Sequence, residues 1–158
     1  MILYRIEKRV HAHKLDGVGA SKEGARWNSK GTCVIYCGEH EATTVLEVLA
    51  HVGEIPDDRV LITYELPDNV SILKPDAKDL PPTWRELPYH TAVQRYGDQF
   101  IMEKKALLLR IPTALATTER NYLMNPDHPE IAKVKVSVSP INYPFDPRLF
   151  DKGKKPTP

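Results

Sequence analysis

The sequence predicts a single α/β (α+β) domain in which strands predominate. Its 158 residues are enough for one well-buried core and few for two. Short apolar or alternating segments are interspersed with two segments of helical periodicity, which is typical of a mixed fold. No internal repeat and no linker divides the chain. We therefore expect one domain over residues 1–150 and a disordered tail, rich in Lys, Gly and Pro, over residues 151–158.

Strands are expected where short segments are alternating or continuously apolar: residues 1–6, 33–37, 59–66, 70–73, 106–111 and 134–138. In the first of these, Leu3 and Arg5 fall on one face because side chains alternate along a strand. The third and fourth segments are close in sequence and are expected to pair with each other. Residues 11–24 are polar and contain several glycines, which predicts a loop.

Two amphipathic helices are predicted, over residues 40–52 and 90–105. In the first helix, four apolar residues recur at helical spacing and are expected to form its buried side: Ala42, Val45, Leu46 and Leu49. Glu47 then lies nearly opposite, on a polar side that it shares with His51. Gly53 is expected to end this helix.

Composition and charge exclude several classes of function. The net charge is +1 and the basic residues are scattered, which argues against direct binding of nucleic acid. No apolar run is long enough to span a bilayer, and charged residues follow the first six residues too closely for a signal peptide. Cys33 and Cys37 would lie about 13 Å apart on a strand, too far to bridge. We interpret them as reduced thiols in a cytoplasmic protein.

The segment around the first predicted helix contains the residues with the clearest chemical potential. Tyr36 lies on a predicted strand eleven residues before Glu47. A strand–turn–helix unit can bring a tyrosine and a carboxylate to one cleft. The alternative is a solvated glutamate in a weak pair with His51, four residues further along the helix.

An arginine lies among glycines just before this unit. Arg26 is within the sequence Gly-Ala-Arg-Trp-Asn, where glycine permits a close backbone approach and a guanidinium can bind phosphate bidentately. Arg5 by itself is typical of a surface or salt-bridging arginine, and the alternative is that it points into the same space. Trp27 is more typical of a core residue. Further along, Asn121 begins a segment rich in turn-forming residues, and its asparagines and His128 are either ligands or turn residues.

Several common catalytic signatures are absent from the sequence. It contains no G-x-S-x-G motif and no P-loop. Gly17-Val-Gly19 lacks the third glycine of a Rossmann fingerprint. The histidines have no companions at metal-ligand spacing, so no metal site is predicted.

Together these motifs identify a resemblance to the RES-domain proteins, which are named for an arginine, a glutamate and a serine. The resemblance extends from Tyr4-Arg5 to Phe150. It rests on several blocks in the same order: Gly-x-Arg26-Trp-Asn, Val-Ile-Tyr36, Thr-x-x-Glu47-Val-Leu-x-His51 and Asn121-Tyr-Leu-x-Asn-Pro-x-His-Pro129.

The resemblance implies a fold like that of ADP-ribosyltransferase toxins, with a split mixed sheet around an NAD-binding cleft and flanking helices. It implies a toxin that degrades cytoplasmic NAD by hydrolysis or phosphorolysis, with inorganic phosphate as a possible co-substrate. The implied partner is an Xre-like helix-turn-helix antitoxin, and the assembly a homodimer or a toxin–antitoxin hetero-oligomer.

By position, four residues match the family's active site: Arg5, Arg26, Tyr36 and Glu47. Thr113 stands where the family has serine, keeping the hydroxyl but adding a methyl group. In the implied mechanism Glu47 stabilises a cationic ribose, Tyr36 stacks on nicotinamide, and Arg5 and Arg26 bind phosphate. Asn121 is assigned to binding the dinucleotide. No metal and no prosthetic group is required.

Two alternatives remain open. An ADP-ribosyltransferase would modify a macromolecular acceptor, but such enzymes commonly have a second acidic residue shortly before the glutamate. This chain has Thr43, Thr44 and Val45 there, and Glu41 is too far upstream on the helix. The other alternative is a non-catalytic module that binds a nucleotide.

Overall fold

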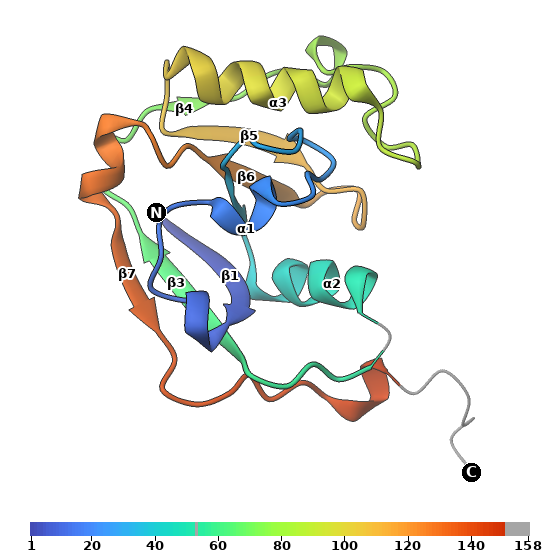
Figure 1. Cartoon of the computed structure of the whole chain (residues 1–158), viewed down its shortest axis with the longest axis vertical. Helices are drawn as coiled ribbons and strands as arrows, with labels where there is room; N and C mark the ends of the chain where they lie inside the picture. The colour runs from blue at the N-terminus through green and yellow to red at the C-terminus, as the bar shows by residue number, and fades with distance from the viewer. Residues whose placement is uncertain (53, 151–158) are drawn as a thin grey trace.

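The computed structural model describes residues 1–52 and 54–150, and a seven-stranded mixed sheet forms its centre (Figure 1). The sheet order is β4-β5-β6-β2-β1-β3-β7. The strands are β1 (Ile2–Lys8), β2 (Ile35–Gly38), β3 (Arg59–Glu65), β4 (Ile72–Leu73), β5 (Leu108–Pro112), β6 (Arg120–Met124) and β7 (Lys135–Val138). The helices are α1 (Val18–Ser21), α2 (Glu41–His51) and α3 (Thr91–Glu103). Short 3-10 turns η1 to η4 occupy Arg9–His11, Ala77–Asp79, Pro129–Lys133 and Pro147–Leu149.

Two predictions concern residues outside this description: the disordered tail over 151–158, and the helix stop at Gly53. Within the described ranges, no helix combines the length and apolar character needed to cross a membrane.

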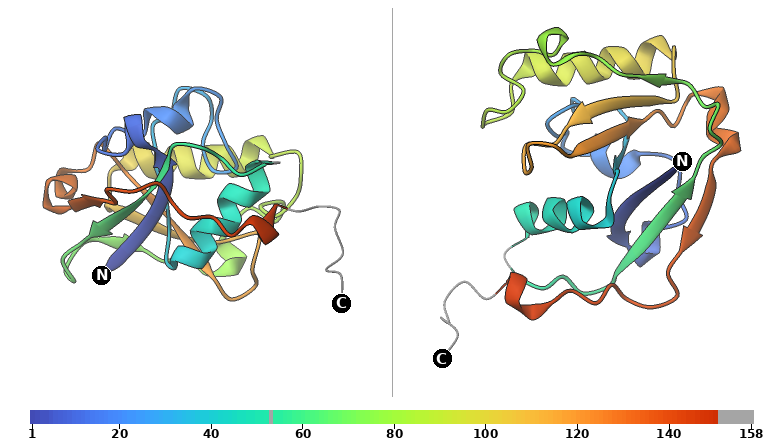
Figure 2. Two further views of the ribbon diagram at one scale, coloured as in Figure 1. Left: turned by 90° about the horizontal axis from the view of Figure 1, so that it is seen from below. Right: turned by 180° about the vertical axis from the view of Figure 1, so that it is seen from behind.

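The sheet is split near its middle. β1 pairs with β3 along its whole length, from Ile2 opposite Glu65 to Lys8 opposite Arg59. By contrast, β1 and β2 pair only where Tyr4 meets Gly38. One half of the sheet is therefore β4-β5-β6-β2, the other is β1-β3-β7, and the two diverge beyond this point. In both figures α2 lies between the diverging halves, and α3 covers the first half on the side away from α2 (Figures 1 and 2).

The sheet packs around two apolar cores, the first of which includes residues of both halves. The first packs Leu3, Val60, Ile62 and Tyr64 of β1 and β3 against residues of the central strands. The second lies between α3 and the face of β5 and β6 and includes Trp27, which is 2% exposed.

Trp27 therefore packs in a core, as expected for a lone tryptophan. A Cβ atom at Gly97 of α3 would overlap the carbonyl oxygen of Trp27, so this close packing requires glycine there.

Most of the predicted elements are confirmed, with one pairing error. α2 and α3 lie within the predicted helical ranges, and each of the six predicted strands overlaps an observed one: β1, β2, β3, β4, β5 and β7. The expected pairing of residues 59–66 with 70–73 is wrong, because β3 pairs with β1 and β7 while β4 runs parallel to β5. Ser71 accounts for this. Its hydroxyl accepts a hydrogen bond from the Leu107 amide at 2.9 Å, and its own amide donates to Glu130 at 2.9 Å, which holds β4 beside β5.

One α-helix and one strand of the described structure were not predicted. α1 interrupts the expected loop over residues 11–24, and β6 lies in the segment interpreted as turn-forming. β6 pairs with β2 on one side and β5 on the other, so its polar Asn121 is buried by sheet pairing that local sequence does not show.

The buried side of α2 is also not the predicted one. Thr43 and Thr44 are buried, whereas Leu46 is 41% exposed. The hydroxyl of Thr43 donates to Glu119 at 3.0 Å, and that of Thr44 donates to the carbonyl oxygen of His40 at 3.1 Å. Because these polar groups have partners, burying them costs little, and contact with the sheet overrides the apolar pattern. Glu47, one turn further along, consequently lies on the inward side.

Candidate active-site cleft

A cleft of about 440 Å³ opens between the two halves of the sheet. α2 forms one wall, and the middle of β1 with the ends of β2, β5 and β6 forms the floor and the opposite wall, together with residues 25–27, Leu87 and Tyr89. All the predicted site residues line this one cleft: Arg5, Arg26, Tyr36, Glu47, Thr113 and Asn121.

Glu47 is held by two neutral donors from the opposite wall. The Thr113 hydroxyl donates to Glu47 Oε1 at 2.9 Å, and Asn121 Nδ2 donates to the same oxygen at 2.6 Å. Hydrogen bonds to an ionised carboxylate are shorter and stronger than neutral ones. The carboxylate is therefore oriented by two contacts on one oxygen, and not by the weak pair with His51 that was the alternative interpretation.

Backbone structure fixes both donors. Thr113 follows β5, is 2% exposed, and also accepts a hydrogen bond from the Leu115 amide at 3.1 Å. Asn121 lies in β6 opposite Ile111 on one side and Gly38 on the other. Its Oδ1 atom is buried without a hydrogen-bond partner among the described residues. Such an acceptor can receive a hydroxyl or amide hydrogen from a ligand.

A second contact ties α2 to the β5–β6 hairpin. His40, which precedes the helix, lies 2.5 Å from Glu119 Oε2, the oxygen that also accepts from Thr43. The hydrogen bond to Glu119 raises the pKa of His40, and the bond from His40 lowers the pKa of Glu119. The helix that carries Glu47 is thereby fastened to the hairpin that carries its two donors.

Tyr36 forms part of the aromatic wall of the cleft, with its hydroxyl already engaged. The hydroxyl donates to Asn28 Oδ1 at 2.8 Å and accepts from the Trp27 amide at 3.1 Å. Burial raises the pKa of Tyr36 despite the Trp27 contact, so the phenol stays protonated. The ring therefore has a fixed position and serves as a wall rather than as an acid.

Arg26 extends from the glycine-flanked loop and anchors the rim of the cleft. Its Nη1 atom donates to the carbonyl oxygens of Trp84 at 2.6 Å and Glu86 at 3.2 Å. Its guanidinium lies 4.9 Å from the centre of the Tyr89 ring, within the range of a cation–π contact. Nη1 of Arg26 thus fixes the backbone at the rim of the cleft, and the other donors of its guanidinium remain available to a ligand.

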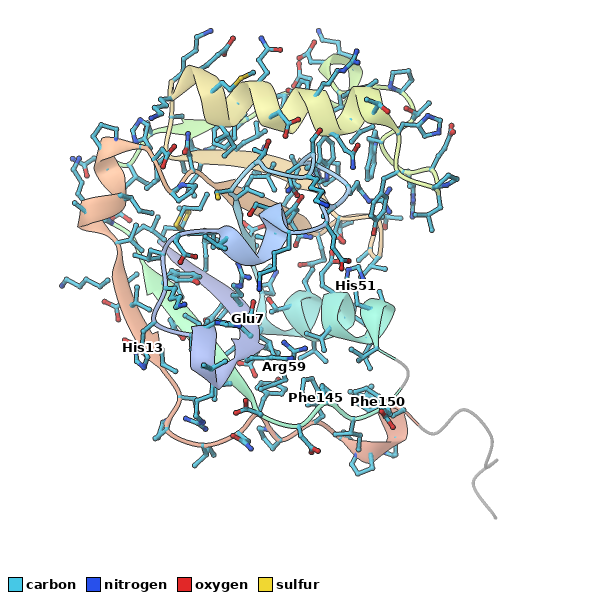
Figure 3. All side chains as sticks on the ribbon, in the orientation of Figure 1. Glu7, His13, His51, Arg59, Phe145 and Phe150 are labelled. Atoms are coloured by element: carbon cyan, nitrogen blue, oxygen red, sulfur yellow. The ribbon has the colours of Figure 1, made fainter. Side chains whose placement is uncertain are left out.

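The opposite end of the cleft contains a charged cluster that sequence reasoning identified only in part. Arg5 Nη2 donates to Glu7 Oε2 at 2.6 Å, and Arg59 Nη1 donates to Glu7 Oε1 at 3.2 Å. Burial opposes ionisation of Glu7, but the charge and hydrogen bond of Arg5, the hydrogen bond from the Lys8 amide and the charge of Arg59 together lower the pKa of Glu7. Figure 3 shows Glu7 and Arg59 near the beginning of α2, with His51 at the far end of that helix.

Arg5 is therefore both a cleft residue and a salt-bridging arginine. Glu7 shares its face of β1 two residues along, a spacing that could have identified it. Nothing near Arg59 in the sequence indicates that it reaches the cleft.

Two other candidates are turn residues. Asn125 Nδ2 donates to the carbonyl oxygen of Ile101 at 2.9 Å, and His128 Nδ1 accepts from the Glu130 amide at 3.2 Å. Cys33 and Cys37 are free thiols, as predicted. Cys37 lines the cleft, where burial raises its pKa to about 12.

The split, curled sheet and the polar cleft between its halves define the class of the molecule, a single-domain α+β protein built around one large pocket. The model of the RES domain family matches residues 2–146, so the chain belongs to the RES domain family. The predicted family and fold class are confirmed.

Curated relatives match over almost their whole length. "Toxin Res" of Yersinia enterocolitica serotype O:8 / biotype 1B is 35% identical, with 94% of this chain and 99% of that protein covered. The "Prs ADP-ribosylating toxin" of Sphingobium sp. (strain YBL2) is 31% identical, with 92% of each chain covered.

A solved structure has the same fold at low identity. It is the MbcT–MbcA toxin–antitoxin complex of M. tuberculosis, with a TM-score of 0.67 and 16% identity. The match covers 96% of this chain and 87% of that chain.

Proposed function

We propose that this protein is the toxin of a toxin–antitoxin pair and that it degrades cytoplasmic NAD by cleaving the nicotinamide–ribose bond. The observation that carries the proposal is the contact of Glu47 with Thr113 and Asn121 inside a cleft that also contains Tyr36 and two arginines. Full-length relatives named as toxins support the biological role.

The chemistry needs a fixed negative charge near the ribose. Cleavage of a glycosidic bond passes through an oxocarbenium-like transition state. Glu47 stabilises the positive charge that grows on the ribose, while Thr113 and Asn121 keep the carboxylate in place through Oε1. Such preorganised electrostatic stabilisation is worth about 2.7–4 kcal/mol where comparable groups have been removed. Nicotinamide leaves as a neutral molecule, so the step needs no strong general acid.

The rest of the cleft binds and orients the dinucleotide. The ring of Tyr36 stacks on nicotinamide, and the free donors of Arg26 and Arg5 bind the phosphates. Asn121 Oδ1, buried and without a partner among the described residues, accepts a hydrogen from a ribose hydroxyl or from the carboxamide. In a hydrolase, water then attacks the ribose; in a phosphorylase, inorganic phosphate does so.

The threonine at the family's serine position is compatible with this role. The Thr113 hydroxyl is within hydrogen-bond distance of Glu47, and its methyl group is buried without displacing that contact. The added methyl group therefore leaves the hydroxyl available.

We further propose an Xre-like helix-turn-helix antitoxin as the partner that blocks the cleft, in a toxin–antitoxin hetero-oligomer or on a toxin homodimer. The fold neighbour was solved as a toxin–antitoxin complex. Exposed apolar side chains surround the mouth of the cleft, with Leu87 72%, Leu115 41% and Tyr89 37% exposed. Exposed apolar side chains that gather at the rim of a pocket are typical of a surface that binds another protein.

The second candidate function is ADP-ribosyl transfer to a macromolecule, which is favoured by the printed name of the Sphingobium relative. The position of Glu41 weighs against it. Glu41 is exposed and does not line the cleft; it accepts a hydrogen bond from the Tyr143 hydroxyl at 2.7 Å. The residues between it and Glu47 supply no carboxylate to orient an acceptor.

The test is to incubate the purified full-length chain with NAD and to measure free nicotinamide. We expect release by the wild type and no measurable release by Glu47→Gln, with matching circular dichroism spectra. The exposed Glu65→Gln serves as the matched control and should retain activity.

Product analysis separates the possible reactions. ADP-ribose formed without phosphate indicates a hydrolase, whereas ADP-ribose 1″-phosphate formed only with phosphate indicates a phosphorylase. Transfer of label from NAD to protein in a cell extract supports the transferase instead. Binding of NAD with no nicotinamide released over hours indicates a non-catalytic module and contradicts the proposal.

A further inference from the structure

Arg59 enters the cleft from β3, the strand on the far side of β1. Its backbone position is fixed on two sides. It pairs with Lys8 of β1, and its carbonyl oxygen accepts from the Tyr143 amide at 2.7 Å. The side chain is 22% exposed and lines the same cleft as Glu47. It belongs to none of the sequence blocks that identify the family.

The hydrogen bonds of Arg59 are incomplete. Nη1 donates to Glu7 at 3.2 Å, but Nε is buried with no partner among the described residues. A guanidinium has five donors and no acceptor, so a buried unpaired Nε–H is costly unless something occupies the space in front of it. A ligand that accepts from Nε would complete the set.

The local charge favours an anion as that ligand. Arg5 and Arg59 share one carboxylate, that of Glu7, which leaves one positive charge uncompensated within this cluster. Glu7 Oε1 also accepts from the Lys8 amide at 2.8 Å, so its hydrogen-bonding capacity is largely used. Among the described residues no second carboxylate forms an ion pair with either arginine. Glu47, which lines the same cleft, contacts Thr113 and Asn121 instead.

The shape of the donors favours phosphate among anions. A planar guanidinium fork matches two oxygens of a phosphate group, and the match is better than that of a lysine ammonium. Because Glu7 holds both arginines at fixed positions, they are preorganised before a ligand arrives.

We propose that Arg59, together with Arg5, forms a phosphate-binding subsite in the cleft, with Arg59 binding the ligand and Glu7 positioning both arginines. The phosphate group is either one of the dinucleotide's phosphates or inorganic phosphate acting as co-substrate. The first source rests on the proposed function, and the second can be tested without it.

The experiment is calorimetric titration of the full-length chain with ADP-ribose and, separately, with inorganic phosphate. Arg59→Gln should weaken binding of one of the two by roughly tenfold or more, the effect expected for losing one charge-assisted hydrogen bond. Arg59→Lys should retain part of the affinity because the charge remains and the fork is lost. Arg95→Gln, which removes an exposed arginine of α3 outside the cleft, is the matched control and should bind as the wild type does.

The two sources give different patterns. Weaker ADP-ribose binding, with a raised KM for NAD and a smaller change in kcat, assigns the subsite to the dinucleotide. Weaker phosphate binding, with a shifted phosphate dependence of the rate, assigns it to inorganic phosphate. Arg59→Gln that folds and binds both ligands as tightly as Arg95→Gln overturns the inference.

A measurement on the wild type covers the case in which Arg59→Gln does not fold. The Nε–H resonance of Arg59, assigned by its loss in Arg59→Lys, should shift on titration with ADP-ribose or phosphate. Absence of a shift with both ligands overturns the inference. A wild type that releases no nicotinamide but binds either ligand through Arg59 contradicts the proposed function and leaves this subsite standing.

Discussion

The two ends of the cleft hold charged side chains in different ways. At one end the carboxylate of Glu47 is oriented by two neutral groups, Thr113 and Asn121. At the other end Arg5 and Arg59 are held by an opposite charge, that of Glu7. Neutral donors orient a carboxylate without cancelling its charge, whereas a salt bridge fixes two cations and cancels one of them. The end with Glu47 therefore keeps its whole negative charge, as the proposed cleavage of the ribose bond requires. The end with Arg5 and Arg59, the binding end, retains one net positive charge, which suits binding of an anion.

Among the groups that hold these charged side chains in place, the largest effect is expected from loss of the Asn121 amide, which orients Glu47. We expect Asn121→Leu to lower kcat for nicotinamide release by about 100-fold, the scale found when a preorganised donor is removed, with a smaller change in KM. Steady-state kinetics on folded protein measures both. A change confined to KM would place Asn121 with the binding end of the cleft instead.

A smaller effect is expected at Thr113, which shares Oε1 of Glu47 with Asn121. Thr113→Val removes the hydroxyl at nearly constant volume, and we expect kcat to fall by about tenfold, the equivalent of one hydrogen bond to a charged group. Thr113→Ser keeps the hydroxyl and should stay within about threefold of the wild type on the same scale. Equal rates for the Val and Ser variants would show that the hydroxyl does not act through Glu47.

Ionisation of Glu7 at the binding end should make the free energy of unfolding depend on pH. The folded-state pKa of Glu7 lies below its ordinary value of 4.5, because Arg5, the Lys8 amide and Arg59 together outweigh the effect of burial. Ionised Glu7 therefore stabilises the fold at pH values above its ordinary pKa. This contribution is lost as the pH falls through the lower pKa of the folded state. We expect the free energy of unfolding of the wild type to fall more than that of Glu7→Gln below about pH 4.5. Parallel urea-unfolding curves from pH 6 to pH 3 would contradict this.

The smallest effect is expected at the exposed contact that fastens α2 to the hairpin. Glu119 raises the pKa of His40. Protonated His40 therefore stabilises the fold at pH values below its ordinary pKa of 6.5, and this stabilisation is lost as the pH rises through the raised pKa. The difference in Tm between wild type and His40→Asn should therefore be greatest near pH 6 and disappear by about pH 9. A difference in Tm that does not change with pH would assign His40 a role in packing alone.

The residues of the site could be predicted from the sequence more completely than the strands of the sheet. All six predicted site residues line one cleft, although their roles in binding and cleavage stay predictions. β6 was missed because Asn121 and its neighbours have turn-forming composition, and only pairing with β2 and β5 makes the segment a strand. Arg59 was missed because a charged residue at the start of a strand has no distinguishing local pattern.

The two long helices, the family motifs and the positions of most strands were readable from the chain itself, since each depends on periodicity or on residues close in sequence. Tertiary structure alone decided which face of α2 turns inward, which strands are neighbours, and which groups hold Glu47. Those choices depend on hydrogen-bond partners far apart in sequence: Thr43 is buried because Glu119 accepts its hydroxyl, and Glu47 is oriented because Asn121 reaches it from β6. A polar side chain is buried only where such a partner exists, and the partner is chosen by the fold.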